Sequence, residues 1–215
     1  QRLFIGGVTH EFKTPLTALL LNVDSLQNTY LDEEGRSAAI ARIEHQTRWL
    51  ERLVQTLLKL ITLEREIERR PCEVDALFDT VRQNTQKSLA DRGVTLITHS
   101  GGGTLNCNAD LIQSLLINLV DNAAKAYDAD APDKRVLLTF SGDTIEVRDF
   151  GRGIPEEAMG RIFEPFYMAD KSRSKKAGGS GLGLALVKRI ADAHDAELTV
   201  KSGVGKGTTV RVHFQ

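Results

Sequence analysis

The chain has 215 residues, of which 41% are hydrophobic and 27% are charged, an ordinary composition for a globular protein. Its 28 basic and 29 acidic residues leave a formal net charge of -1, so no overall field favours nucleic acid or an acidic membrane surface as a partner. Cys72 and Cys107 have no metal-ligand spacing and are typical of reduced thiols. No apolar run approaches the ~18 residues of a membrane span, and no signal peptide is recognisable.

Two apolar stripes predict a helical hairpin in the first third of the chain. The first stripe predicts a helix from near the start to about Gln27, and the polar stretch 28–37 predicts a turn. The second stripe predicts a helix around residues 40–61. Such a hairpin buries both stripes most simply by pairing with a second copy into a four-helix bundle. The apolar steps run through Phe12, Leu16, Leu19, Val23 and Leu26, and then through Ile40, Ile43, Thr47, Leu50, Val54, Leu57 and Ile61.

Pro71 follows a charged stretch and marks the predicted boundary between domains 1–70 and 71–215. The second domain mixes strands and helices, which predicts helices on one face of a mixed sheet. Strands are predicted at 72–74, 94–98, 104–107, 136–140, 144–149, 197–201 and 208–214. Helices are predicted from a cap at Asp75 to about 91, from Asn108 or Asp110 through 127, and over 181–193.

The stretch from His10 to Leu16, HEFKTPL, carries the first candidate chemistry. His10 falls outside the apolar stripe, so its ring should reach water or a partner. Glu11 is adjacent, and Thr14 lies one helical turn further on the same face. Pro15 cannot donate a backbone hydrogen bond and should bend or loosen the helix. A plain surface histidine on an amphipathic helix is the alternative interpretation.

A polar helix face follows in the segment NLVDNAAK, which begins at Asn118. Asn118, Asn122 and Lys125 are spaced four and three residues apart, so they share one face. Two amides and an amine can hold a hydrated Mg²⁺ and the phosphates around it, because an amide oxygen suits an ion that keeps most of its waters. A solvated helix face remains the alternative.

The segment DFGRGIP ends a predicted strand at Asp149 and has glycines at alternate positions, Gly151 and Gly153. Glycines at these positions allow the backbone to approach a flat ligand. The carboxylate of Asp149 can accept a hydrogen bond from an exocyclic amine such as that of adenine. An ordinary turn is the alternative.

The segment GSGLGL, beginning at Gly179, opens a predicted helix, whose free N–H groups make an anion site. A dinucleotide-binding fingerprint is excluded, because no βαβ unit precedes it. The cations Lys171, Arg173, Lys175 and Lys176 precede this segment and predict a lid, although a solvated loop is the plainer interpretation. Gly205–Thr208 by itself predicts a hairpin turn.

Taken in order, these segments resemble the N, G1, F (Arg161–Tyr167), G2 and G3 boxes of the histidine-kinase ATP domain, and residues 4–16 resemble the H-box of sensor histidine kinases. The resemblance implies an all-α dimeric hairpin domain followed by a Bergerat-type α/β sandwich that binds ATP. It implies that His10 is the phosphoacceptor, that Glu11 assists it and that Thr14 supports dephosphorylation of a partner. Asn122 would bind Mg²⁺. The implied ATP-binding residues are Asn118, Asn122, Lys125, Tyr127, Asp149, Gly151, Gly153, Ile154, Phe166, Lys175, Lys176, Gly179, Gly181, Leu182, Gly183, Leu184 and Thr208.

One departure concerns the aromatic residue that follows the N-box lysine in many members. Here Ala126 intervenes before Tyr127, which leaves open whether Tyr127 stacks on the nucleotide. The family further implies autophosphorylation from ATP, phosphoryl transfer to an aspartate of a response regulator, and a cytoplasmic position in a bacterial protein anchored to the membrane by an upstream segment. The alternatives are an ATP-driven conformational machine and a scaffold without turnover. His45, His99, His194 and His213 are interpreted as structural or surface residues.

Overall fold

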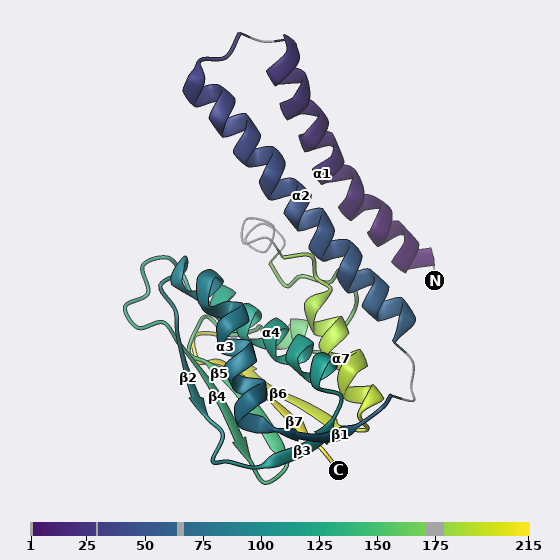
Figure 1. Ribbon diagram of the computed structural model, residues 1–215, viewed down its shortest axis with the longest axis vertical. Helices are drawn as coiled ribbons and strands as arrows, with labels where there is room; N and C mark the ends of the chain where they lie inside the picture. Colours follow the sequence, from purple (N-terminus) through teal and green to yellow (C-terminus); the bar gives the residue numbers. More distant parts are fainter. Residues whose placement is uncertain (1, 29, 64–66, 171–178) are drawn as a thin grey trace.

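The computed structural model describes residues 2–28, 30–63, 67–170 and 179–215. It has two parts, a long helical hairpin and an α/β domain on which the hairpin stands (Figure 1). Among the described residues, no helix combines the length and the apolar character needed to cross a membrane.

The hairpin consists of α1 (Arg2–Asn28) and α2 (Glu33–Thr62), as predicted. Helix α2 begins before the end of the predicted turn because Asp32 caps it, its carboxylate accepting a hydrogen bond of 2.8 Å from the backbone N–H of Gly35. Helix α1 continues through Pro15. The hairpin leaves several large apolar side chains exposed, namely Leu16, Leu20, Leu21, Val23, Ile40, Val54, Leu58 and Ile61.

The α/β domain contains a two-stranded ribbon and a separate five-stranded sheet. In the ribbon, β1 (Arg70–Glu73) pairs antiparallel with β3 (Thr104–Cys107). The sheet has the order β2-β4-β5-β7-β6, and only β2 and β4 are parallel. Its strands are β2 (Thr95–His99), β4 (Arg135–Ser141), β5 (Thr144–Asp149), β6 (Glu197–Gly203) and β7 (Gly207–His213).

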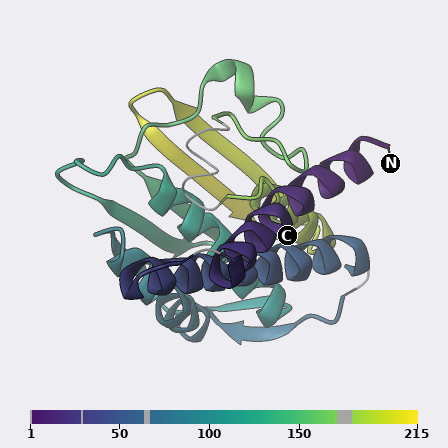
Figure 2. The same ribbon diagram turned by 90° about the horizontal axis from the view of Figure 1, so that it is seen from above.

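Three helices cover one face of this sheet: α3 (Val74–Ala90), α4 (Ala109–Lys125) and α7 (Gly183–Ala193). The short helix α5 (Glu156–Met159) was not predicted. The predicted strand at 72–74 begins earlier, at Arg70, and α3 begins at Val74 with Glu73 as its N-cap, so Asp75 lies inside the helix and does not cap it. Figures 1 and 2 show the hairpin on the helical side of the domain, where α2 contacts α7.

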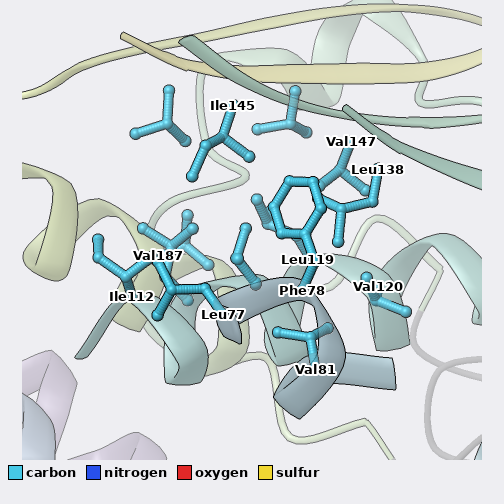
Figure 3. Packing of buried hydrophobic residues seen from close by; sticks show 14 of the residues in the cluster. Leu77, Phe78, Val81, Ile112, Leu119, Val120, Leu138, Ile145, Val147 and Val187 are labelled. Atoms are coloured by element: carbon cyan, nitrogen blue, oxygen red, sulfur yellow. The ribbon is translucent and has the colours of Figure 1, made fainter. Parts of the chain in front are cut away.

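The core of the domain lies between the sheet and these helices (Figure 3). Alternate residues of the strands point inward, and the helices contribute residues three and four apart. Each fully buried Leu, Ile or Val side chain contributes roughly 1.5–3 kcal/mol relative to exposure. The buried residues that Figure 3 labels are Leu77, Phe78, Val81, Ile112, Leu119, Val120, Leu138, Ile145, Val147 and Val187.

His194 joins the ends of two helices inside this domain. Its Nδ1 donates to the carbonyl of Ile190 at 2.8 Å, and its Nε2 accepts from the backbone N–H of Asn108 at 3.1 Å. These partners require the neutral ring, and burial lowers the pKa of His194. Of the two alternatives predicted for His194, a structural or a surface residue, the structure shows the first. His45, His99 and His213 are exposed, as predicted.

Candidate active site

His10 lies on the exposed side of α1. Its side chain is 70% exposed, and its Nδ1 is 3.4 Å from Oε1 of Glu11. The hydroxyl of Thr14 donates to the carbonyl of His10 at 3.4 Å, one turn away. The carboxylate of Glu11 therefore lies beside Nδ1 and favours the tautomer of His10 that carries its proton there. Nε2 is then unprotonated and can act as a nucleophile.

Asp149 lies in a second region, in a cavity of about 310 Å³ between the sheet and α4. The backbone N–H groups of Gly151 and Thr208 both donate to its Oδ1, at 2.9 and 3.2 Å. The other carboxylate oxygen, Oδ2, is left for a ligand. Burial raises the pKa of Asp149 to about 6, more than its two hydrogen bonds lower it. Val147, Val210 and Leu119 are among the apolar residues that line the same cavity.

An adjoining cavity of about 280 Å³ shares part of its lining with the first, including Asn122, Arg152 and Ile154. It contains the polar face of α4 and the start of α7, where the backbone N–H groups of a helix attract anions. The two cavities thus adjoin and together make up the candidate site. One end has a buried carboxylate between apolar walls, and the other end has amides, cations and a helix N-terminus.

The close packing of α7 on α4 depends on a glycine. A Cβ atom at Gly183 would lie 2.9 Å from Oδ1 of Asn118 and 3.6 Å from Nδ2 of Asn122. The side-chain amide of Asn118 donates to the carbonyl of Ser114 at 2.7 Å, which holds the rest of that side chain in the cavity. Lys125 forms an ion pair of 2.5 Å with Asp121, which lines the same cavity.

Most of the predicted ATP-binding residues come together in these two cavities. The residues that line one or both are Asn118, Asn122, Lys125, Asp149, Gly153, Ile154, Gly179, Gly181, Gly183, Leu184 and Thr208. Lys175 and Lys176 lie outside the described residues, as do Lys171 and Arg173. Tyr127, Gly151, Phe166 and Leu182 line neither cavity.

These four residues make hydrogen bonds or packing contacts within the protein instead. The hydroxyl of Tyr127 accepts from the N–H of Phe150 at 2.9 Å and donates to the carbonyl of Arg135 at 2.5 Å, so the ring joins two strands. Gly151 permits contact with the end of α4, where a Cβ atom would lie 2.6 Å from the carbonyl oxygen of Ala126. Leu182 is fully buried.

Phe166 packs against the hairpin. It adopts a left-handed backbone with φ of 66°, and its N–H donates to the carbonyl of Gly181 at 2.9 Å. A Cβ atom at Gly7 would lie 2.5 Å from the Phe166 ring, so the ring occupies the space that this glycine leaves on α1. Leu53 and Leu57 of α2 form a buried cluster with Leu182, and Phe166 packs against this cluster.

Sequence reasoning missed the contribution of α2 to the site. Trp49, Arg52, Leu53 and Thr56 line the 280 Å³ cavity. The apolar stripe of α2 gave no signal for them, because they lie on another face of the helix. Arg152, which lines both cavities, was likewise not singled out, although it lies between two predicted glycines.

Comparison with known proteins places this arrangement in a family. Residues 107–215 match the family described as histidine kinase-, DNA gyrase B- and HSP90-like ATPases, and residues 1–66 match the His Kinase A phospho-acceptor domain. The chain belongs to the sensor histidine kinases. The two matched segments contain, respectively, the site around Asp149 and the helix that carries His10.

Curated relatives agree with this assignment. The chain is 34% identical to sensor histidine kinase YkoH of Bacillus subtilis, a match that covers 100% of this chain and 47% of the relative. It is 32% identical to phosphate regulon sensor protein PhoR of Pseudomonas aeruginosa, over 98% of this chain and 49% of the relative. The chain therefore spans about half the length of these two relatives.

Solved structures have the same fold. The histidine kinase AdeS of Acinetobacter baumannii matches with a TM-score of 0.70 and 20% identity, covering 96% of this chain and 98% of that one. The crystal structure of full-length ShkA in complex with AMPPNP matches with a TM-score of 0.69 and 28% identity, covering 96% of this chain and 44% of that one. The prediction of a helical hairpin followed by an ATP-binding α/β sandwich is confirmed.

Proposed function

We propose that this chain is the catalytic core of a sensor histidine kinase, which transfers the γ-phosphoryl group of ATP to His10 and then to an aspartate of a response regulator. The observation that carries the proposal is that one chain contains both an exposed His10 paired with Glu11 and two adjoining cavities whose lining suits a nucleotide. The pair alone would be a surface histidine, and the site alone would suit any ATPase of the wider family.

The site supports ATP as the substrate. Adenine fits the apolar end, where Oδ2 of Asp149 accepts a hydrogen bond from its exocyclic amine. The polyphosphate fits the other end, beside Lys125 and the N-terminus of α7. The ShkA structure is a complex with AMPPNP, an ATP analogue, which supports the same chemistry here.

The residues present also fit a magnesium ion that is held mainly by phosphates and water. In the part of the chain that the structure describes, no group of three His, Cys, Asp or Glu side chains can hold a metal by itself. Asn118 and Asn122 offer amide oxygens in the phosphate cavity, a donor type that suits Mg²⁺. When bound, the ion would neutralise charge on the phosphates. Asn122 is the residue we assign to it.

The geometry of His10 supports one of its ring nitrogens as the attacking atom. Because Nδ1 faces Glu11, Nε2 is the nucleophile. Nε2 forms a bond to the γ-phosphorus while the bond from that phosphorus to the β–γ bridging oxygen breaks, and ADP leaves with the electron pair. The proton on Nδ1 is stabilised by, and then released to, Glu11 or solvent. The product is a phosphoramidate on Nε2.

His10 lines neither cavity, so transfer requires the hairpin and an ATP site to change their relative position. Exposed apolar residues on both helices support a homodimer through residues 1–70, in which a second hairpin completes a four-helix bundle. The receiver domain of the response regulator would dock near His10. The hydroxyl of Thr14 would orient water when the phosphorylated regulator is hydrolysed. The complete protein would hold this core on the cytoplasmic side of a membrane through an upstream segment.

Incubation with γ-labelled ATP and Mg²⁺ tests the proposal. The chain should acquire acid-labile, base-stable label, and His10→Gln and Asn122→Ala should both lose it. His10→Gln should still bind ATP, whereas Asn122→Ala should bind it more weakly. If His10→Gln hydrolyses ATP as fast as the parent and neither protein is labelled, the chain is an ATP-driven machine. If no ATP binds, it is a scaffold.

A further inference from the structure

Helix α2 forms one wall of the phosphate cavity. Trp49, Arg52 and Thr56 lie on successive turns of α2, and all three line the 280 Å³ cavity together with Asn122 and Lys125 of α4. A ligand that fills this cavity therefore contacts both the hairpin and the α/β domain. The cavity exists only while the two parts are docked.

The guanidinium of Arg52 is available for a ligand. Within the described ranges, neither a hydrogen bond nor an ion pair involves it, and the residue is exposed. Arg48, one turn earlier, is instead paired with Glu44 at 2.6 Å. An unpaired guanidinium at the mouth of an anion site has the geometry and the permanent charge that phosphate recognition uses.

The charges of the cavity also favour a polyphosphate. Arg52, Lys125 and Arg152 are cationic, and Asp121 is the acidic residue among those that line it. Because Asp121 already pairs with Lys125, the two arginines supply the excess positive charge. They come from different parts of the chain, Arg52 from the hairpin and Arg152 from the α/β domain.

Specific contacts fix the position of Arg52. The ring of Phe166 packs into the space at Gly7, the side chain of Lys59 donates to the hydroxyl of Ser114 at 3.0 Å, and Arg189 donates to the carbonyl of Leu63 at 2.8 Å. All three contacts join the end of the hairpin that lies beside the α/β domain to that domain. They hold the guanidinium over the cavity without taking part in it.

We propose that Arg52 is a phosphate-binding residue that the hairpin supplies to ATP, so that the polyphosphate bridges the two domains. The inference rests on the proposed ATP site and adds a residue to it. Its consequence is thermodynamic coupling, because a triphosphate that binds the docked state preferentially must also stabilise docking.

The whole 215-residue chain suffices for the test. Affinities for ATP and adenosine are measured by calorimetry for the parent, Arg52→Gln and Arg52→Lys, with Arg48→Gln as the matched loss of charge on the same helix. Arg52→Gln should lower the affinity for ATP about tenfold. This is the lower end of the range expected for the loss of a hydrogen bond to a charged group, because Arg52 is exposed. Adenosine should bind equally well. Arg52→Lys should recover part of the loss, and Arg48→Gln should match the parent.

Trp49, the single tryptophan of the chain, reports on the location of the ligand. ATP should change its emission in the parent. Unchanged emission at saturating ATP, unchanged ATP affinity in Arg52→Gln, or an equal loss in Arg48→Gln would each overturn the assignment. A parent that binds no ATP would instead refute the proposed function.

A second variant tests the coupling at a residue that does not line the cavity. Gly7→Ala places a methyl group against the Phe166 ring and should loosen docking, whereas Gly6→Ala meets no atom within 4 Å and is the control. Gly7→Ala should weaken the binding of ATP. Adding Arg52→Gln to it should lower the affinity for ATP little further, since Arg52 in an undocked hairpin has no contact with the ligand to lose. Full additivity of the two losses would contradict the bridge.

Discussion

The α/β domain and the helical hairpin bury apolar residues in different ways. The domain encloses its own core, and Leu115, Leu116, Leu138 and Ile145 are completely inaccessible to solvent. The hairpin buries few residues, and Leu53 and Leu57 are buried in a cluster that includes Leu182 of the domain. The first part is self-sufficient, whereas the second takes its stability from surfaces outside itself.

The hairpin therefore has two apolar faces with different partners. One face, with Trp49 and Leu53, contacts the α/β domain. The other face, with Leu20, Leu58 and Ile61, is open in the single chain and fits the proposed second copy. A signalling helix whose two faces are shared in this way can transmit a change in one contact to the other.

The largest expected effect separates the two parts directly. Leu138→Ala removes a completely buried side chain from the domain and should lower the free energy of unfolding by about 2–5 kcal/mol. Leu58→Ala, at a position that is 55% exposed, should change it little and should instead weaken self-association. Urea denaturation followed by circular dichroism measures the first effect, and sedimentation measures the second. Equal losses of stability would contradict the comparison.

Two adjacent residues of α2 test its two faces. Leu53→Ala deletes a side chain that is buried between the hairpin and the domain, and should cost about 2 kcal/mol, the lower range for a buried leucine. The emission of Trp49 should then report hairpin unfolding at lower urea than circular dichroism reports for the domain. Val54→Ala is the control, because Val54 is 40% exposed on the open face. If Trp49 emission and circular dichroism report the same urea midpoint in both variants, Leu53 does not join the hairpin to the domain.

Local patterns explain why so much of each part could be predicted. The apolar steps of α1 and α2, the Asn108 cap and the glycine turns all depend on neighbours a few residues away. The order of the nucleotide motifs then identified the family and the fold. Many of the residues that line the cavities followed from those motifs, with Asp149 at the apolar end and Lys125 at the phosphate end.

The contacts between the parts could not be predicted in this way. Gly7 and Phe166 are far apart in sequence, and no periodicity pairs them. Tyr127 and Gly151 belong to nucleotide motifs, but the structure uses them to join strands and to seat the end of α4, because those backbone groups need partners. Motif membership indicated the neighbourhood of the site and not the direction in which each side chain points.

Nucleotide affinity should depend on pH through Asp149. Its pKa of about 6 means that the carboxylate is ionised at neutral pH and protonated below that value, when Oδ2 no longer accepts a hydrogen bond freely. Affinity for ADP should fall as pH drops below about 6, at most about tenfold per pH unit. Asp149→Asn should bind ADP more weakly and is the control. It should lack the fall in affinity near pH 6 that is due to Asp149, while it keeps any pH dependence that comes from the phosphates. An identical step in both proteins would exclude Asp149 as its cause.

The smallest expected effect concerns stability and again separates the two parts. Burial lowers the pKa of His194, so the unfolded chain binds its proton more readily, and the stability contributed by the neutral ring is lost as pH falls below about 6.5. Asp149 acts oppositely, because a raised folded-state pKa makes the fold more stable as pH falls from about 6 toward 3.8. The measurement therefore uses Asp149→Asn as the background, with and without His194→Asn.

In the Asp149→Asn chain, the urea midpoint by circular dichroism should fall between about pH 7 and about pH 5.5, and the added His194→Asn change should flatten that slope while lowering stability throughout. Because His194 joins the end of α7 to the start of α4 inside the domain, the slope belongs to the α/β transition. When Leu53→Ala separates the hairpin transition from that of the domain, the Trp49 signal should lose this pH dependence. A slope that persists in the Trp49 signal would mean that the hairpin still unfolds together with the domain, which would break the distinction between a self-sufficient part and a dependent one.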